Sequence, residues 1–172
     1  MPPMRASRAV PLAILLASIA LVGGALLFQY VGGLQPCELC LYQRWPYYIA
    51  IVLTLAALLL GRRPATLALV ALCALLFLAN AVLAFYHVGV EQHWFAGPSA
   101  CTGTLGGAGS LADFKARLMA QQPVRCDAPQ WSLFGISLAG WNLLASLALL
   151  VFSITALRRP SLRRVQEQGR VA

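Results

Sequence analysis

Four of the five cysteines fall into two pairs of very different spacing. Cys37 and Cys40 stand in a C-x-x-C, and Cys101 and Cys126 lie 25 residues apart further along the chain. A C-x-x-C lets two sulfurs bond across about one turn, and at a helix start the unpaired amide groups favour a thiolate over a thiol. Because the thiolate is the attacking species in disulfide exchange, the tight pair is a candidate redox centre.

Arg44 follows the second cysteine of the tight pair by four residues. If this segment is helical, Arg44 lies on the same face as Cys40, one turn deeper. A permanent cation beside a cysteine favours the thiolate. A cation close to a membrane boundary is also costly unless it serves a function. We therefore expect Arg44 to stabilise a Cys40 thiolate.

Four cysteines would also suit a zinc site or a pair of structural disulfides. Zinc sites of this type need two tight pairs, and a 25-residue gap through a glycine-rich segment does not present two sulfurs at once. We therefore expect no bound metal. Structural disulfides between two loops stay open as an interpretation, although they leave Arg44 without a purpose. Cys73, in the middle of an apolar run, is expected to be a small buried side chain without a redox role.

The elements that hold these residues are expected to be membrane helices. Apolar residues make up 60% of the chain and charged residues only 10%, whereas a soluble domain carries about a quarter charged residues. A spanning helix needs roughly 20 apolar residues, and four runs are long enough: about 10–31, 42–60, 65–88 and 133–157. The first run is too long for the apolar part of a cleaved signal peptide. The sequence thus predicts an all-α membrane protein, a single domain over 1–172 built as a four-transmembrane-helix bundle.

The arginines predict the orientation of the bundle. Tails 1–9 and 158–172 and the turn between the second and third runs carry nine arginines against one acid, Glu167. Four cations and four acids cancel on the opposite side. The positive-inside rule therefore places both termini in the cytoplasm and loops 32–41 and 89–132, with all four paired cysteines, outside. Basic residues at helix ends are topology signals that face lipid headgroups. No aromatic residues interleave with them, which excludes nucleic-acid binding.

The long loop 89–132 is expected to contain one short helix. Its segment 99–110 is rich in small residues and is expected to be mobile. Ser110 to Asp113 then fits a helix start. The following turns place apolar residues on one face, which predicts an amphipathic helix lying on the bilayer, with packing on the protein's own loop as the alternative. These residues are Leu111, Phe114, Leu118 and Met119.

His87 lies at the outer end of the third run, at a depth similar to that of Arg44. It could face the same site as Arg44, or pair with Glu91 one turn further on. The neighbouring aromatic residues could line that site, but aromatic residues at this depth are expected as an interfacial belt in any case. They are Trp45, Tyr47, Tyr48, Phe85 and Tyr86.

Taken together, these motifs resemble the DsbB family of bacterial inner-membrane thiol oxidases. The resemblance rests on Cys37–Arg44, Tyr86–Glu91, Cys101, Cys126–Asp127 and, after Trp131, Phe134–Asn142, and it covers nearly the whole chain outside the termini. It implies a quinone-dependent protein-disulfide oxidoreductase of the inner membrane. Such a protein reoxidises a DsbA-like thioredoxin-fold oxidase in the periplasm and passes the electrons to membrane ubiquinone or menaquinone. Disulfide bond formation in periplasmic proteins is thereby sustained.

The resemblance also implies roles for single residues. A thiolate of the DsbA-like partner attacks Cys101 of a Cys101–Cys126 disulfide, and the freed Cys126 then attacks Cys37. Cys40 is released and donates electrons to the quinone, which Arg44 and His87 would bind.

Two other functions are compatible with the same sequence features. A quinone reductase similar to vitamin K epoxide reductase also sets a C-x-x-C in a four-helix bundle, but its reactive pair would sit late in the chain, and here it precedes the second helix. The non-enzymatic alternative is a membrane scaffold protein whose disulfides are purely structural.

Overall fold

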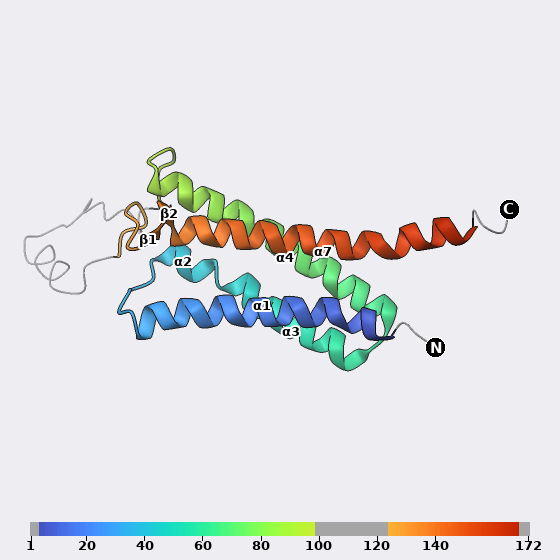
Figure 1. Cartoon of the computed structure of the whole chain (residues 1–172). Helices are drawn as coiled ribbons and strands as arrows, with labels where there is room; N and C mark the ends of the chain where they lie inside the picture. The colour runs from blue at the N-terminus through green and yellow to red at the C-terminus, as the bar shows by residue number, and fades with distance from the viewer. Residues whose placement is uncertain (1–3, 99–123, 169–172) are drawn as a thin grey trace, which may run out of the picture.

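The structure, a computed structural model, describes residues 4–98 and 124–168 and is almost entirely helical (Figure 1). In chain order the elements are α1 (Met4–Tyr30), α2 (Glu38–Tyr42), α3 (Trp45–Leu60), α4 (Arg63–Glu91), β1 (Ser132–Leu133), β2 (Ile136–Ser137) and α7 (Leu138–Gln168). Within the described residues, four helical segments are long and apolar enough to span a membrane: Arg8–Tyr30, Glu38–Leu60, Arg63–Glu91 and Leu138–Arg158. The prediction of an all-α membrane protein with four spanning helices is confirmed.

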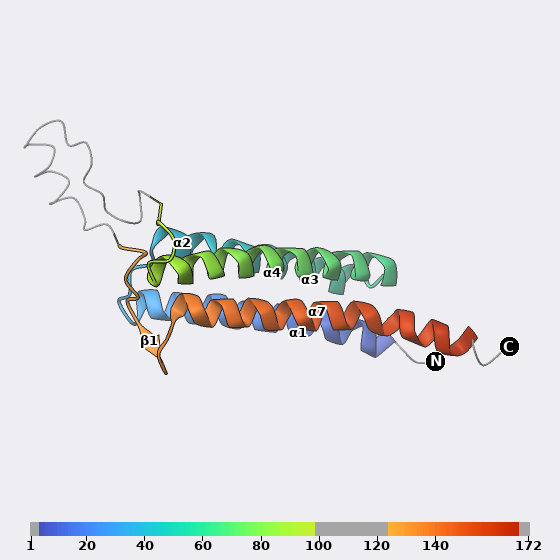
Figure 2. The same cartoon turned by 90° about the horizontal axis from the view of Figure 1, so that it is seen from above.

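The four long helices form two layers, with α3 and α4 in one and α1 and α7 in the other (Figure 2). The main contacts join α4 to α7, α1 to α3 and α3 to α4, whereas α1 and α7 touch each other at few points. The core between the layers contains fully buried side chains such as Ile14, Ala50 and Phe77, and Cys73 is buried among them as expected. Large apolar side chains such as Val52 and Leu75 point outward, as they do on lipid-facing helices.

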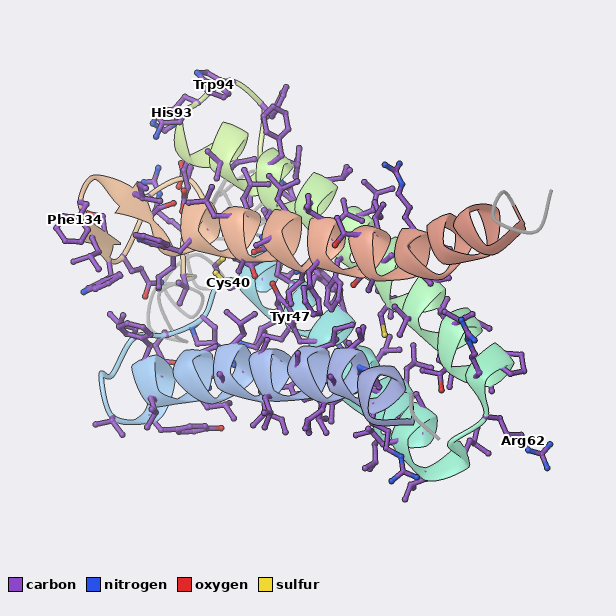
Figure 3. All side chains as sticks on the ribbon, turned by 45° about the vertical axis from the view of Figure 1, so that its right-hand side comes forward. Cys40, Tyr47, Arg62, His93, Trp94 and Phe134 are labelled. Carbon is purple, nitrogen blue, oxygen red and sulfur yellow. The ribbon has the colours of Figure 1, made fainter. Side chains whose placement is uncertain are left out.

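The bundle has two chemically different ends, which we call the cysteine end and the arginine end. Cys40 and Phe134 lie near the first, and Arg62 lies at the second, in the turn between α3 and α4 (Figure 3). In that turn Gly61 adopts a left-handed conformation (φ 61°), its N–H bonds to the carbonyl of Ala57, and a proline follows at the start of α4. The start of α1 and the end of α7 also lie at the arginine end (Figure 1).

The second spanning segment is broken, and it begins earlier than predicted. Helix starts at Glu38, not at residue 42, and is interrupted at Gln43 and Arg44. Pro46 explains the interruption, because proline has no N–H to bond the carbonyl four residues earlier and its ring clashes with that carbonyl. The N–H of Arg44 accordingly bonds to Leu41 at three residues' spacing. The sequence was expected to form a regular helix from Cys40 to Arg44. The structure shows that this helix is interrupted before Arg44.

The fourth helix also departs from the predicted bounds at both ends. Residues 133–137, predicted as helix, are part of a small antiparallel hairpin in which Ser132 pairs with Ser137. Phe134 and Gly135 form its turn with positive φ angles of 53° and 78°, as a two-residue hairpin turn requires. Helix α7 starts at Leu138 and runs to Gln168, so most of the predicted tail 158–172 is helical. Helix α1 likewise begins at Met4, before the predicted start at 10.

Candidate active site

Cys37 and Cys40 lie together at the start of α2. Cys37 is the residue that caps the helix, and its sulfur accepts a hydrogen bond from the backbone N–H of Cys40 at 3.3 Å. The two Sγ atoms are 2.9 Å apart, and both residues carry free thiols. A hydrogen bond from the Cys40 thiol is the main cause that lowers the pKa of the Cys37 thiol. Burial opposes it, and His87 and the backbone N–H of Cys40 lower the pKa further. In the reduced pair the stabilised thiolate is therefore Cys37.

Cys126 belongs to the same buried cluster. It is disulfide-bonded and 1% exposed, and it packs with Cys37, Leu39 and Val90. Cys40 lies at the edge of this cluster. Cys101 and the predicted helix after residue 110 lie outside the described residues. The described sulfur of the wide pair is thus packed beside the tight pair, although 86 residues separate Cys126 from Cys40 in the sequence.

His87 faces the cysteines from the end of α4. It is 2% exposed, and its Nε2 lies 3.6 Å from the Sγ of Cys37. The same nitrogen is 4.0 Å from a carboxylate oxygen of Glu91. His87 therefore lies beside the cysteine pair and beside Glu91 at the same time.

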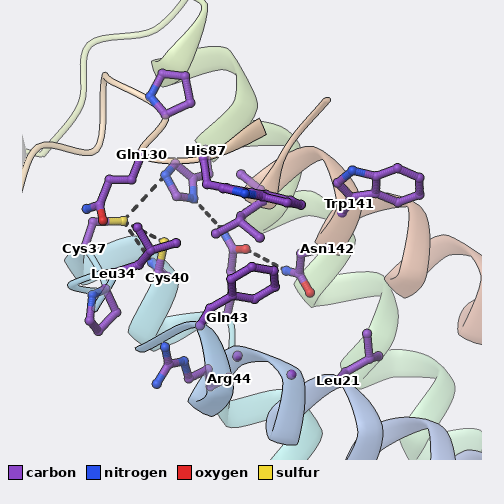
Figure 4. Close-up of a pocket in the computed structure, with 18 of the residues that line it drawn as sticks. Leu21, Leu34, Cys37, Cys40, Gln43, Arg44, His87, Gln130, Trp141 and Asn142 are labelled. Carbon is purple, nitrogen blue, oxygen red and sulfur yellow. Dashed lines mark hydrogen bonds between the residues drawn. The ribbon is translucent and has the colours of Figure 1, made fainter. Parts of the chain in front are cut away.

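A chain of polar side chains fixes the ring of His87 from behind. Tyr47 donates to Asn142 Oδ1 at 2.6 Å, Asn142 Nδ2 donates to Gln43 Oε1 at 2.6 Å, and Gln43 Nε2 lies 2.9 Å from His87 Nδ1. The chain continues from Tyr47 to Ser146, and its inner links are drawn in Figure 4. Because the Gln43 amide donates to Nδ1, the neutral imidazole carries its proton on Nε2, facing the Cys37 sulfur.

This chain was not predicted from the sequence. Tyr47 was expected in the aromatic belt or the site lining, Asn142 was expected to make at most an interhelical hydrogen bond, and Gln43 was given no role. Yet Gln43 is 4% exposed and hydrogen-bonded on both sides. Polar side chains inside apolar runs are costly and usually functional, and that signal could have found them. Trp45 and Phe85 are exposed, as belt residues should be.

Arg44 is oriented toward the first helix. Its Nη1 donates a 2.6 Å hydrogen bond to Oε1 of Gln29 on α1. Arg44 and Cys40 nevertheless line one cavity. Gln29, which the sequence analysis did not single out, therefore holds the guanidinium in place at the wall of that cavity.

The cavity has a volume of about 760 Å³ and lies between α1 and α7 (Figure 4). Small residues line this space on both helices, Gly24 and Ala25 on α1 and Ala145 and Ala148 on α7. At the cysteine end the lining becomes polar. The polar lining includes Cys37, Cys40, Gln43, Arg44, His87, Glu91 and Asn142.

A family model described as "Disulfide bond formation protein DsbB" matches residues 7–156. The chain belongs to the DsbB family. It is 33% identical over 165 residues to disulfide bond formation protein B 1 of Pseudomonas aeruginosa, covering 91% of this chain and 98% of that protein. It is 31% identical over 157 residues to disulfide bond formation protein B of Aromatoleum aromaticum, covering 89% and 93%. No solved structure matches the chain.

Membership of the DsbB family supports a role in disulfide bond formation for this multi-pass membrane protein. Within that frame the structure brings Cys37, Cys40, Arg44 and His87 to one cavity and packs Cys126 beside it.

Proposed function

We propose that this DsbB family member is a quinone-dependent thiol oxidase. It reoxidises a DsbA-like thioredoxin-fold protein in the periplasm and delivers two electrons to ubiquinone or menaquinone in the bacterial inner membrane. One observation carries the proposal: Cys126, Cys37 and Cys40 gather where an apolar cavity between membrane helices ends in Arg44 and His87. The arginine-rich opposite end supports a cytoplasmic location for both termini and a periplasmic location for the cysteines.

Thiol transfer between the two cysteine pairs is supported by the packing of Cys126 beside Cys37 and Cys40. A thiolate of the partner attacks Cys101 of the expected Cys101–Cys126 disulfide, and the mixed disulfide that forms frees Cys126 as a thiolate. Cys126 attacks Cys37 of an oxidised Cys37–Cys40 pair, which breaks that bond and releases Cys40. The partner's second thiol then attacks the mixed disulfide, so that the partner leaves oxidised and Cys101 is freed as a thiolate. Cys101 attacks Cys126 of the Cys37–Cys126 bond, which restores the Cys101–Cys126 disulfide and releases Cys37. The net result is one disulfide made in the partner and one reduced Cys37–Cys40 pair.

The Cys40 thiolate suggested by the sequence belongs to the stage after Cys126 has bonded to Cys37. At that stage Cys37 can no longer be the anion, and Cys40 lines the cavity with Arg44 nearby. In the fully reduced pair the anion is on Cys37. The two cysteines therefore carry the negative charge at different stages of one cycle.

The cavity fits a quinone. Its volume of about 760 Å³ lies within the usual range of about 300–1,000 Å³ for small-molecule sites. Its apolar walls suit an isoprenoid tail, and the sparse contact between α1 and α7 leaves a route from the lipid. A quinone supplies the capacity to accept two electrons and two protons. Arg44, held by Gln29, would donate hydrogen bonds to a ring oxygen, and the Nε2–H of His87 would donate another.

The reduction potentials explain why a thiol oxidase of this kind would place its site in the membrane, next to quinone. DsbA itself has a potential of about −120 mV, so a dithiol acceptor of ordinary potential could not oxidise it. Each 30 mV is worth about 1.4 kcal/mol for a two-electron couple. Sustained turnover therefore needs a strongly oxidising acceptor, and that acceptor is dissolved in lipid.

The test is steady-state turnover of the purified protein in detergent with a reduced DsbA-like partner and a soluble quinone. Turnover should stop in Cys40→Ser and in Cys101→Ser. The matched control is Cys73→Ser, because Cys73 is buried in the core away from the cavity lining and should leave turnover unchanged. Turnover that persists in Cys40→Ser would remove the assigned electron exit.

A further inference from the structure

The reduced tight pair and His87 form a donor set for a metal ion. The Sγ atoms of Cys37 and Cys40 and a ring nitrogen of His87 all lie within 4.8 Å of one another. Cys37 and His87 are buried, and Cys40 is partly exposed at the cavity wall. This set differs from the four-cysteine zinc site that the sequence analysis rejected, because one imidazole takes the place of the second cysteine pair.

We propose that the reduced Cys37–Cys40 pair and His87 bind Zn²⁺. Two thiolates and one imidazole are ligands that zinc prefers. On binding, the two thiols release their protons and no electrons are exchanged, so the site exists in the dithiol state and is lost in the disulfide state. The fourth position faces the cavity, as in zinc sites that keep one place open.

The distances suit tetrahedral zinc. With Zn–S near 2.3 Å and Zn–N near 2.0 Å, a tetrahedral site places sulfur and nitrogen about 3.5 Å apart and two sulfurs about 3.8 Å apart. Cys37 Sγ and His87 Nε2 are already 3.6 Å apart. The two sulfurs, 2.9 Å apart in the hydrogen-bonded pair, must separate by slightly under 1 Å. Rotation of the Cys40 side chain toward the cavity supplies that movement.

The charge around the site favours a cation. A carboxylate oxygen of Glu91 lies 4.0 Å from His87 Nε2, and the other oxygen of that carboxylate is hydrogen-bonded by Ser137. The carboxylate is therefore fixed beside the metal position. The two arginines that line the cavity have other partners, because Arg44 is directed to Gln29 and Arg125 to Asp127.

The polar chain behind His87 can support zinc binding after one rearrangement. A histidine that binds zinc through Nε2 carries its proton on Nδ1 and needs an acceptor there. A half-turn of the Gln43 amide presents its oxygen to Nδ1, and a half-turn of the Asn142 amide restores the link between the two. Each link is kept with donor and acceptor exchanged. Gln43 is thus a positioning residue for the metal.

Zinc binding is tested on the full-length chain in detergent without partner or quinone, so the result does not depend on the proposed function. The chain, reduced without oxygen, is titrated with Zn²⁺ against a coloured chelator, and bound metal is counted after gel filtration. One zinc per chain is expected in a Cys101→Ser/Cys126→Ser background when the pair is reduced, and none when it is oxidised. This comparison of redox states leaves the three proposed ligands unsubstituted.

Substitutions then identify the ligands. Cys37→Ser or Cys40→Ser should weaken binding more than a hundredfold, His87→Ala at least tenfold, and Gln43→Leu about tenfold through its effect on the imidazole. Cys73→Ser is the matched control and should bind as tightly as the parent. Co²⁺ bound in place of zinc should show tetrahedral absorption with thiolate charge transfer, and His87→Ala should shift it.

Equal zinc binding by the oxidised and reduced chains would overturn the proposal, and so would an affinity unchanged by His87→Ala. If the proposed oxidase function holds, the same ion keeps the pair reduced and stops turnover. Zinc added to the reduced chain should then inhibit, and a chelator should restore activity.

Discussion

Replacement of Asn142 by leucine tests whether the polar chain sets the state of His87. The side chain of Asn142 makes two short hydrogen bonds, both of 2.6 Å, to Tyr47 and to Gln43. Leucine has the same branched shape but makes neither bond. Tyr47 keeps its contact with Ser146, whereas the Gln43 oxygen loses the donor it has, so its amide is no longer held in one direction.

The expected loss of stability is modest. Hydrogen bonds between membrane helices contribute about 0.6 kcal/mol on average and at most about 1.7 kcal/mol. Two such bonds therefore give a destabilisation of about 1–3 kcal/mol. The expected effect on chemistry is larger, because one preorganised hydrogen-bond donor to a developing negative charge contributes about 10²–10³ in rate. Loss of the correct tautomer should slow oxidation of the reduced pair by quinone at least about tenfold.

The direct assay is nitrogen NMR of the imidazoles. The chain contains two histidines, His87 and His93, so a His93→Gln variant assigns the signals. The parent should show His87 protonated at Nε2, and Asn142→Leu should show a mixture of tautomers together with the slower rate in stopped flow. The matched control is Ser153→Ala on the same helix, because Ser153 bonds only to Leu149 of its own helix in the described structure. An unchanged tautomer and rate in Asn142→Leu would refute the reasoning.

Three further predictions follow from the site. The pKa of Cys37 is lowered, so its thiolate persists as the pH falls. The rate of alkylation of the reduced pair, measured against pH, should therefore stay high to lower pH than for an ordinary thiol. His87→Phe should move the midpoint of this pH profile upward. Arg44→Met should raise the KM for soluble quinone about tenfold or more, whereas Gln29→Leu, which only frees the guanidinium, should raise it less; equal effects would contradict the assigned positions. Ala148→Phe should fill the space between α1 and α7 and weaken quinone binding in a titration, with no change in exchange between the cysteine pairs.

The sequence predicted the spanning helices because long apolar runs and one-sided arginines are properties of the chain itself. It misplaced the ends of these helices where local chemistry intervened. Pro46 interrupted the second segment, and the positive φ angles of Phe134 and Gly135 turned the predicted start of the fourth helix into a hairpin.

The site was predictable where spacing alone carries the chemistry, as in Cys37 and Cys40. The approach of Cys126 and His87 to that pair depends on how the helices pack, and the packing cannot be derived from local sequence patterns. The hydrogen-bond partners of Asn142 could not be predicted for the same reason, because they are 99 and 95 residues away in the sequence.

The most direct test of the account is a single turnover without any protein partner. The fully reduced chain, with Cys101 and Cys126 replaced by serine, is mixed without oxygen with one equivalent of soluble quinone, and quinone absorbance and free thiols are followed together. The account predicts one quinone reduced for each Cys37–Cys40 disulfide formed, and no reaction in the Cys40→Ser version. Quinone that stays oxidised while the pair is reduced, or that is reduced equally well without Cys40, would contradict it.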